Sequence, residues 1–92
     1  MFVIEDRTHS DWMGEFQTIG EAISELSRLR TIAWDEPPNR CPCSRWKTCR
    51  RDYDLIEFGT ASTPWHPLRR VPALSVSSAG ATWLLPDGQS PA

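Results

Sequence analysis

Apolar side chains recur at helical spacing between residues 18 and 30, and this pattern constrains the fold more than any other in the chain. The five residues of this face fall at offsets of 0, 3, 4, 7 and 10, and they are Ile19, Ala22, Ile23, Leu26 and Leu29. Offsets of this kind place side chains on one face of a helix. A helix of this length is about 20 Å long at roughly 1.5 Å per residue, which is enough to cover one face of a small sheet.

Both ends of the same segment carry signals for helix termini. Thr18 followed by Glu21 fits a capping box, in which the hydroxyl accepts a hydrogen bond from a first-turn N–H. Arg28 and Arg30 lie near the other end, where the helix dipole favours cations. The sequence therefore predicts a helix over residues 18–30.

Short apolar alternations on either side of this helix predict strands. They lie at residues 2–7, 11–16, 53–58, 71–76 and 81–85. The order β-β-α-loop-β-β-β predicts an α+β fold, with an antiparallel sheet of about five strands and one amphipathic helix on one face. Turns are expected at Thr8–Ser10 and at Ser77–Gly80, and Trp12 and Trp83 fall in strand patterns that predict core positions.

A long segment without periodicity, at about residues 34–51, separates the helix from the later strands. Pro37, Pro38 and Pro42 prevent a regular helix there. Long irregular loops in small domains are usually functional or disordered, and the tryptophans and cysteines of this segment favour order. We expect a single domain over residues 1–86 that includes this ordered loop, followed by a frayed tail at 87–92.

Positive charge concentrates in the same loop. The chain has a net charge of −2, yet residues 37–51 carry five basic side chains and no acidic one. Arginine and tryptophan are the residue types that dominate protein-binding hot spots. The sequence therefore predicts a small, non-catalytic binding or modulatory protein that docks on another macromolecule. The expected binding residues are Trp34, Arg45, Trp46, Lys47, Arg50 and Arg51, joined by Trp65 and Arg69.

Two other interpretations of the basic loop stay open. Cations interleaved with an aromatic side chain also suit single-stranded nucleic acid, as in an accessory protein or a small phage-type inhibitor of a nucleic-acid machine. Alternatively, the basic side chains are paired with acids of the same domain or simply solvated, in which case the loop is structural.

Three cysteines, Cys41, Cys43 and Cys49, lie within nine residues of this loop. Together with His66 they could supply a Cys₃His zinc site. The C-x-C spacing is poor for this purpose, because an extended chain points alternate side chains to opposite faces. Reversible redox chemistry of Cys43 and Cys49, a nucleophile–base pair with His66, and idle thiols remain as alternatives. No cofactor is favoured.

Several functional classes lack their sequence signals. No apolar run approaches the roughly 20 residues that cross a bilayer, and the N-terminus becomes acidic before a signal-peptide core can form. There is no glycine-rich phosphate loop and no HExxH motif. We expect a cytoplasmic protein that is not an enzyme and does not associate with membranes.

The loop also carries the pattern W-D-x-x-P-N-x-x-P-C-x-x-W-x-x-C between Trp34 and Cys49. In this pattern and in its opening strands, the chain resembles small, uncharacterised bacterial proteins. The resemblance implies a bacterial origin and no activity, substrate or cofactor.

Overall fold

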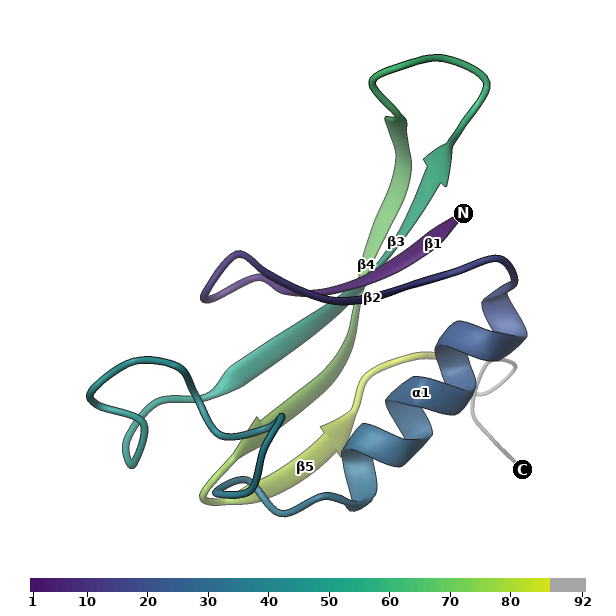
Figure 1. The fold of residues 1–92 in the computed structure, drawn as a ribbon. Coiled ribbons are helices and arrows are strands. Elements are labelled where there is room, and N and C mark those ends of the chain that lie inside the picture. The colour runs from purple at the N-terminus through teal and green to yellow at the C-terminus, as the bar shows by residue number, and fades with distance from the viewer. Residues whose placement is uncertain (87–92) are drawn as a thin grey trace.

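A five-stranded antiparallel sheet carries a single helix on one face (Figure 1). The computed structural model describes residues 1–86, so the tail expected at 87–92 lies outside the described residues. The elements are β1 (Phe2–Asp6), β2 (Asp11–Phe16), α1 (Ile19–Thr31), β3 (Arg51–Gly59), β4 (His66–Ser77) and β5 (Gly80–Trp83). The sheet order is β2-β1-β3-β4-β5, which confirms the predicted α+β fold class.

Helix α1 forms where the apolar pattern predicts it. Thr18 caps its N-terminus, because the backbone N–H of Glu21 donates to the Thr18 hydroxyl at 3.2 Å. Ala22, Leu26 and Leu29 are buried against the sheet. Since buried apolar area is the main favourable term in folding, this face fixes the helix to the sheet.

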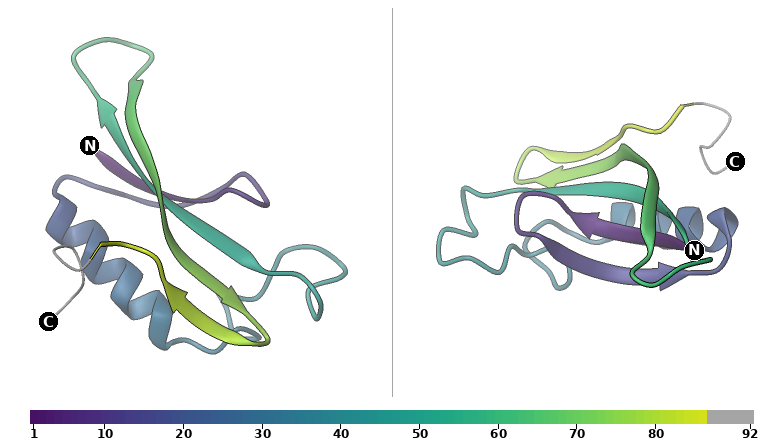
Figure 2. Two further views of the ribbon diagram at one scale, coloured as in Figure 1. Left: turned by 180° about the vertical axis from the view of Figure 1, so that it is seen from behind. Right: turned by 90° about the horizontal axis from the view of Figure 1, so that it is seen from above.

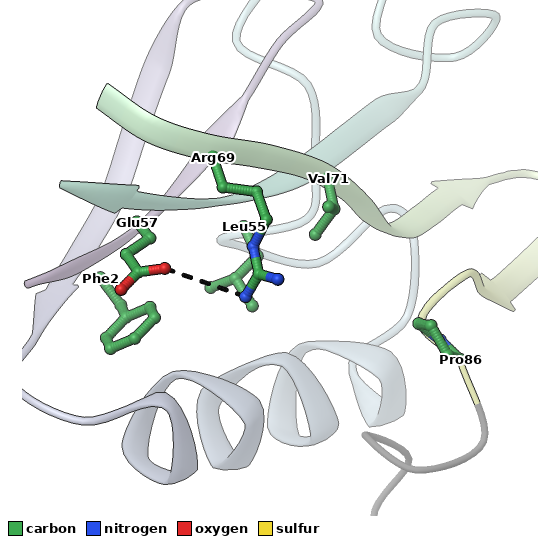
Figure 3. Close-up of a pocket in the computed structure, with 6 residues that line it drawn as sticks. All are labelled: Phe2, Leu55, Glu57, Arg69, Val71 and Pro86. Carbon is green, nitrogen blue, oxygen red and sulfur yellow. Dashed lines mark ion pairs between the residues drawn. The ribbon is translucent and has the colours of Figure 1, made fainter.

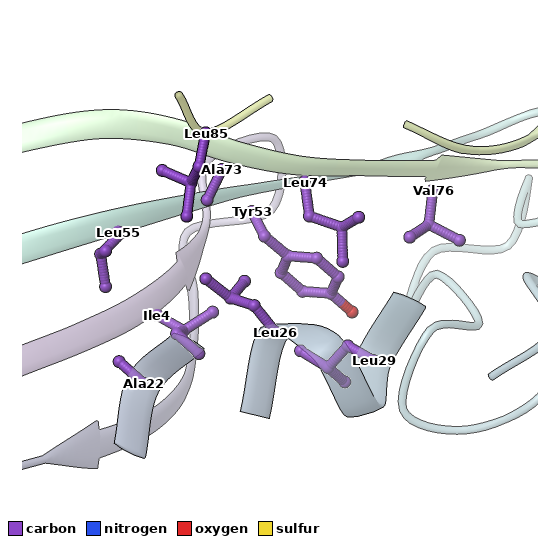
Figure 4. Packing of buried hydrophobic residues seen from close by; sticks show 10 residues of the cluster. All are labelled: Ile4, Ala22, Leu26, Leu29, Tyr53, Leu55, Ala73, Leu74, Val76 and Leu85. Carbon is purple, nitrogen blue, oxygen red and sulfur yellow. The ribbon is translucent and has the colours of Figure 1, made fainter. Parts of the chain in front are cut away.

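The core lies between α1 and one face of the sheet (Figure 4). Its members come from the helix, three strands and the segment after β5, and they are Ile4, Ala22, Leu26, Leu29, Tyr53, Leu55, Ala73, Leu74, Val76 and Leu85. Leu85, which was expected in the last strand, follows it instead, because β5 ends at Trp83. Tyr53 projects its ring through the middle of this cluster toward the end of the helix.

The β1–β2 hairpin and the β3–β4 hairpin are joined by antiparallel pairing of β1 with β3. The turn after β1 therefore lies beside the start of β3. Asp6 pairs with Tyr53 in the β1–β3 ladder and with Asp11 in the β1–β2 ladder. The tip of the first hairpin, residues 7–10, therefore lies next to the chain that enters β3 from the loop. Both segments are at one end of the sheet, and the β3–β4 connection at residues 60–65 is at the other (Figures 1 and 2).

Strand β4 is longer than the sequence suggests, since it begins at His66 rather than near Val71. It contains Pro67 and Pro72, which cannot donate to a ladder. Strand β5 pairs only with residues 74–77 of β4, so both prolines lie on the half of β4 whose outer edge has no paired strand among residues 1–86.

The prediction that Trp12 belongs to the core is wrong, since its side chain is 49% exposed. The β1–β2 register shifts between Ile4 and Glu5, and this irregularity sets Trp12 opposite Glu5. Its indole Nε1 donates to the Glu5 carboxylate at 3.0 Å, and its ring packs on Phe58. Trp83 is half-buried and packs against the core.

In the part of the chain that the structure describes, α1 is too short and too polar to span a membrane.

Candidate metal centre

The irregular loop is held in place by one buried amide. Asn39 is 1% exposed, and its Nδ2 donates to the carbonyls of Leu29 at 2.7 Å and Ile32 at 2.9 Å. Its Oδ1 accepts a hydrogen bond from the Tyr53 hydroxyl at 2.7 Å. Asn39 thus adds a second donor to the Leu29 carbonyl, which also accepts from the Ile32 N–H, and it joins the loop to the core at the end of α1.

Arg51 adds a second attachment from the start of β3. Its Nη2 donates to the carbonyls of Pro38 at 2.9 Å and Arg40 at 3.1 Å. Its Nη1 lies 3.1 Å from Asp6 Oδ2 and 3.0 Å from Asp11 Oδ2. The sequence placed Arg51 among the outward binding residues, but the structure buries it, because two carboxylates of the first hairpin neutralise its charge inside the fold.

Asp6 is the centre of the polar network at this end of the sheet. Its carboxylate is fully buried and accepts hydrogen bonds from the backbone N–H groups of Thr8 and Asp52, both at 3.1 Å. It also lies 2.5 Å from Nδ1 of His9. In a neutral imidazole whose Nδ1 donates to a carboxylate, Nε2 carries a free lone pair, and Nε2 of His9 faces the cysteines of the loop.

A tight turn returns the chain to that imidazole. The backbone N–H groups of Thr48 and Cys49 both donate to the Arg45 carbonyl at 3.1 Å. The turn brings Cys49 back beside Cys41, and the Cys49 sulfur lies 3.2 Å from His9 Nε2. The Cys41 and Cys49 sulfurs and a His9 ring nitrogen all lie within 4.8 Å of one another. All three cysteines have free thiols.

Electrostatics at this cluster follow from its partial burial. Desolvation opposes protonation of His9, but interactions with the Asp6 carboxylate and with nearby Cys43 outweigh it and raise the pKa of His9. Burial, together with the neighbouring Cys49 thiol, raises the pKa of Cys41 to about 12. Without a cation in the cluster, Cys41 is therefore an uncharged thiol and a poor nucleophile.

Two thiols and an imidazole that meet at one point are ligand types that zinc selects in proteins. Sulfur ligands of a zinc ion lie roughly 3.8 Å apart, given Zn–S bonds of about 2.3 Å in a tetrahedron. A separation of up to 4.8 Å between the two sulfurs would have to close by about 1 Å or less, whereas the Cys49 sulfur and His9 Nε2 at 3.2 Å would have to separate slightly. The Asp6–His9 hydrogen bond is the carboxylate contact that usually orients a zinc-bound histidine from behind. The cluster thus offers three candidate metal ligands, one of which is oriented by a buried carboxylate.

The same atoms also form a thiol–imidazole–carboxylate series, Cys49–His9–Asp6, which resembles the order of a nucleophilic triad. Cys41 adds a second thiol within 4.8 Å of the first, which a nucleophile–base pair does not require and which can serve as a metal ligand. The two cavities described below are lined by other residues, so neither offers this series a substrate pocket.

His66, which the sequence grouped with the cysteines, begins β4 and pairs with Gly59. It lies at the far end of the sheet from the loop (Figure 1). His9 takes its place. The sequence signal for His9 was weak, because adjacency of the first hairpin turn to the loop depends on β1 pairing with β3, and no local pattern reveals that pairing.

The remaining expected binding residues divide into two groups. Trp34 and Trp46 lie together with ring centroids 5.8 Å apart, and the Arg40 guanidinium lies 3.9 Å from the centroid of Trp46. Arg45 and Lys47 are exposed on the same turn. Arg50 pairs with Asp52 at 3.2 Å.

Trp65 and Arg69 lie elsewhere. Trp65 packs on Phe58 with ring centroids 6.0 Å apart. Arg69 lies 3.8 Å from Glu57, and together they border an apolar cavity of about 140 Å³ between the sheet and α1 (Figure 3). The structure therefore does not join these two residues to the loop surface.

Comparison of the chain with protein-family models, with curated proteins and with solved structures finds no match. The resemblance to small bacterial proteins consequently stays a prediction.

Proposed function

We propose that this protein is a small, non-catalytic binding module whose loop at residues 34–50 is fixed by a zinc ion. The observation that carries the proposal is the convergence of Cys41, Cys49 and His9 within 4.8 Å, with His9 oriented by buried Asp6 at 2.5 Å. This arrangement supports the zinc alternative of the sequence, with His9 in place of His66 as the nitrogen ligand.

Cys43 is the fourth ligand in this proposal. It is half-buried, and its proximity contributes to the raised pKa of His9. The Cys43 sulfur lies outside the three-atom cluster, so its side chain has to turn toward the ion. Four protein ligands close a tetrahedral site, which is the pattern of structural rather than catalytic zinc. The C-x-C spacing is compatible with such a site because Pro42 lies between two thiols of a turning segment, not of an extended strand.

A metal at this position suits the size of the chain. Domains of this length bury a limited core and frequently use a metal or disulfides for additional stability. The loop between α1 and β3 contains no helix or strand, and its three thiols lie in its second half. A zinc ion would connect that half to the first hairpin, just as Asn39 and Arg51 connect the first half to the core.

The test is a metal titration of the reduced chain. We expect protein purified under reducing, chelator-free conditions to bind about one equivalent of zinc. Cobalt(II), used as a spectroscopic probe, should give the intense visible bands of tetrahedral thiolate coordination. A metal content below about 0.1 equivalent after zinc reconstitution and desalting would contradict the proposal.

The two histidines of the chain provide a matched pair of variants. His9→Ala should weaken zinc binding by at least about tenfold and shift the cobalt bands, whereas His66→Ala should leave both unchanged. Circular dichroism of both variants checks that each one folds. Equal zinc affinity for the two variants would remove His9 from the site.

A further inference from the structure

Three cations around the Trp46 indole form no ion pair among residues 1–86. Arg40 and Lys47 lie 3.9 and 5.7 Å from the Trp46 ring centroid, and Arg45 is exposed at the start of the same turn. By contrast, the neighbouring Arg50 pairs with Asp52 and Arg51 with Asp6. The fold thus neutralises the two bases nearest β3 and leaves Arg40, Arg45 and Lys47 without an ion pair in the described chain.

The acids that begin the loop do not neutralise these cations. Asp35 and Glu36 are exposed, and neither forms an ion pair in the described chain. An isolated group of like charges on a protein of net charge −2 is a feature that bears on binding partners rather than on folding.

The two indoles beneath these cations are already engaged with the protein. Trp46 is half-buried, and its ring contacts Trp34 as well as Arg40. Nucleic-acid platforms present open aromatic faces to bases, and base stacking here would displace the Arg40 guanidinium. Guanidinium groups fixed against an aromatic ring instead offer their N–H donors to carboxylates in bidentate geometry.

Trp34 extends the same surface into a groove. A cavity of about 280 Å³ lies between the end of α1 and the β4–β5 turn, and its lining includes Trp34, Ile32, Val76, Ala81 and Arg30. An apolar side chain fits beside Trp34 in this groove while flanking carboxylates reach the cations of the turn.

We propose that the surface formed by Trp34, Arg40, Arg45, Trp46 and Lys47 binds an acidic segment of a partner protein, one that carries an apolar residue between its carboxylates. The inference rests on the proposed function, since zinc fixes the turn that holds the cations. Charge complementarity sets the chemistry of the partner, and the groove beside Trp34 receives its apolar residue.

The test uses a fluorescein-labelled peptide of Asp and Glu with a central Leu, and fluorescence anisotropy with the zinc-loaded full chain. The controls are the same peptide with every acid replaced by its amide and a single-stranded oligonucleotide of equal charge. We expect saturable binding of the acidic peptide, weakened by added salt. Binding of the amide peptide with similar affinity, or stronger binding of the oligonucleotide, would overturn the inference.

Charge reversal locates the surface. Arg45→Glu/Lys47→Glu should weaken peptide binding by at least about tenfold. Arg28→Glu/Arg69→Glu changes the net charge equally at exposed positions elsewhere and should change the affinity less than about twofold. Equal weakening by both variants would show non-specific attraction and contradict the inference.

Zinc analysis of the same samples separates this inference from the proposed function. A chain that holds zinc but fails to bind the peptide contradicts the acidic-partner inference alone. A chain that binds the peptide equally well without zinc contradicts the role of the metal in fixing the loop. The oligomeric state of the same samples provides one more check. If the chain forms dimers at higher concentration and the acidic peptide does not dissociate them, the surface binds a second copy of the chain, and the proposed partner is wrong.

Discussion

Arg51 and Asp6 form a buried ion pair across strands β1 and β3, with Nη1 and Oδ2 3.1 Å apart. The pair joins the first hairpin to the loop, because the same guanidinium donates to the carbonyls of Pro38 and Arg40. Removing one partner of a buried pair leaves an uncompensated charge in a medium of low dielectric constant, and this costs more than the pair itself contributes.

Arg51→Met should therefore lower the free energy of unfolding by about 3–5 kcal/mol. The adjacent Arg50 provides the control, since it is exposed and pairs with Asp52 at the surface. Arg50→Met should cost less than about 1 kcal/mol. Urea denaturation of both variants measures the difference. A similar cost for the two substitutions would mean that the buried network does not hold the fold.

Leu26 tests the packing of the helix on the sheet. It is fully buried in the core, whereas Leu68 is 62% exposed. Leu26→Ala should cost about 2–5 kcal/mol, because it removes apolar contacts and leaves a cavity. Leu68→Ala should change stability by less than about 0.5 kcal/mol. Thermal and urea unfolding give both values, and a small cost at Leu26 would contradict the position of α1.

Tyr53 predicts a loss of stability at alkaline pH. Burial raises the pKa of its phenol above the ordinary value of about 10. Above that pH the unfolded chain loses a proton that the folded chain keeps, so stability present below pH ~10 is lost as the pH rises. The free energy of unfolding should fall by up to about 1.4 kcal/mol per pH unit.

Chemical denaturation across this pH range measures the slope. Tyr53→Phe should remove this contribution, and at neutral pH it should cost about 1–2 kcal/mol, because Asn39 loses its hydroxyl partner. Tyr53 is the one tyrosine in the sequence, so ultraviolet absorbance of tyrosinate reports it alone. Ionisation of the folded chain near pH ~10 would contradict the prediction.

Thiol alkylation should distinguish the three cysteines in the zinc-free chain. Cys41 is 7% exposed and its pKa is raised to about 12, while Cys43 and Cys49 are half-buried. Iodoacetamide should therefore modify Cys41 last, as peptide mass spectrometry can show. Addition of zinc should slow modification of all three. Unchanged rates with zinc would indicate that the thiols are not ligands.

Local patterns in the sequence were sufficient to predict most of the fold. The spacing from Ile19 to Leu29 gives the helix, and the alternations around Tyr53 and Val76 give strands. They could not predict that Trp12 faces away from the core, because a one-residue irregularity in the β1–β2 register decides the side on which it lies.

The site depended on contacts between distant residues. The three cysteines were evident as candidate ligands, but His9 becomes their neighbour only because β1 pairs with β3. Arg51 and Arg45 belong to the same run of basic residues in the sequence. Arg51, however, is the first residue of β3, and this position directs its side chain toward Asp6 and the interior. Charge counts cannot separate these two arginines, since burial follows from tertiary pairing.

The prolines of β4 also determine how the molecule meets other chains. An open strand edge usually offers alternating N–H and C=O groups to which a foreign strand can add, and this is a common route to aggregation. Pro67 and Pro72 lie on the half of β4 that β5 does not cover, and each one removes an N–H from that row. Association by strand addition is disfavoured along this edge, so side-chain surfaces such as the tryptophan-containing turn are left to make specific contacts.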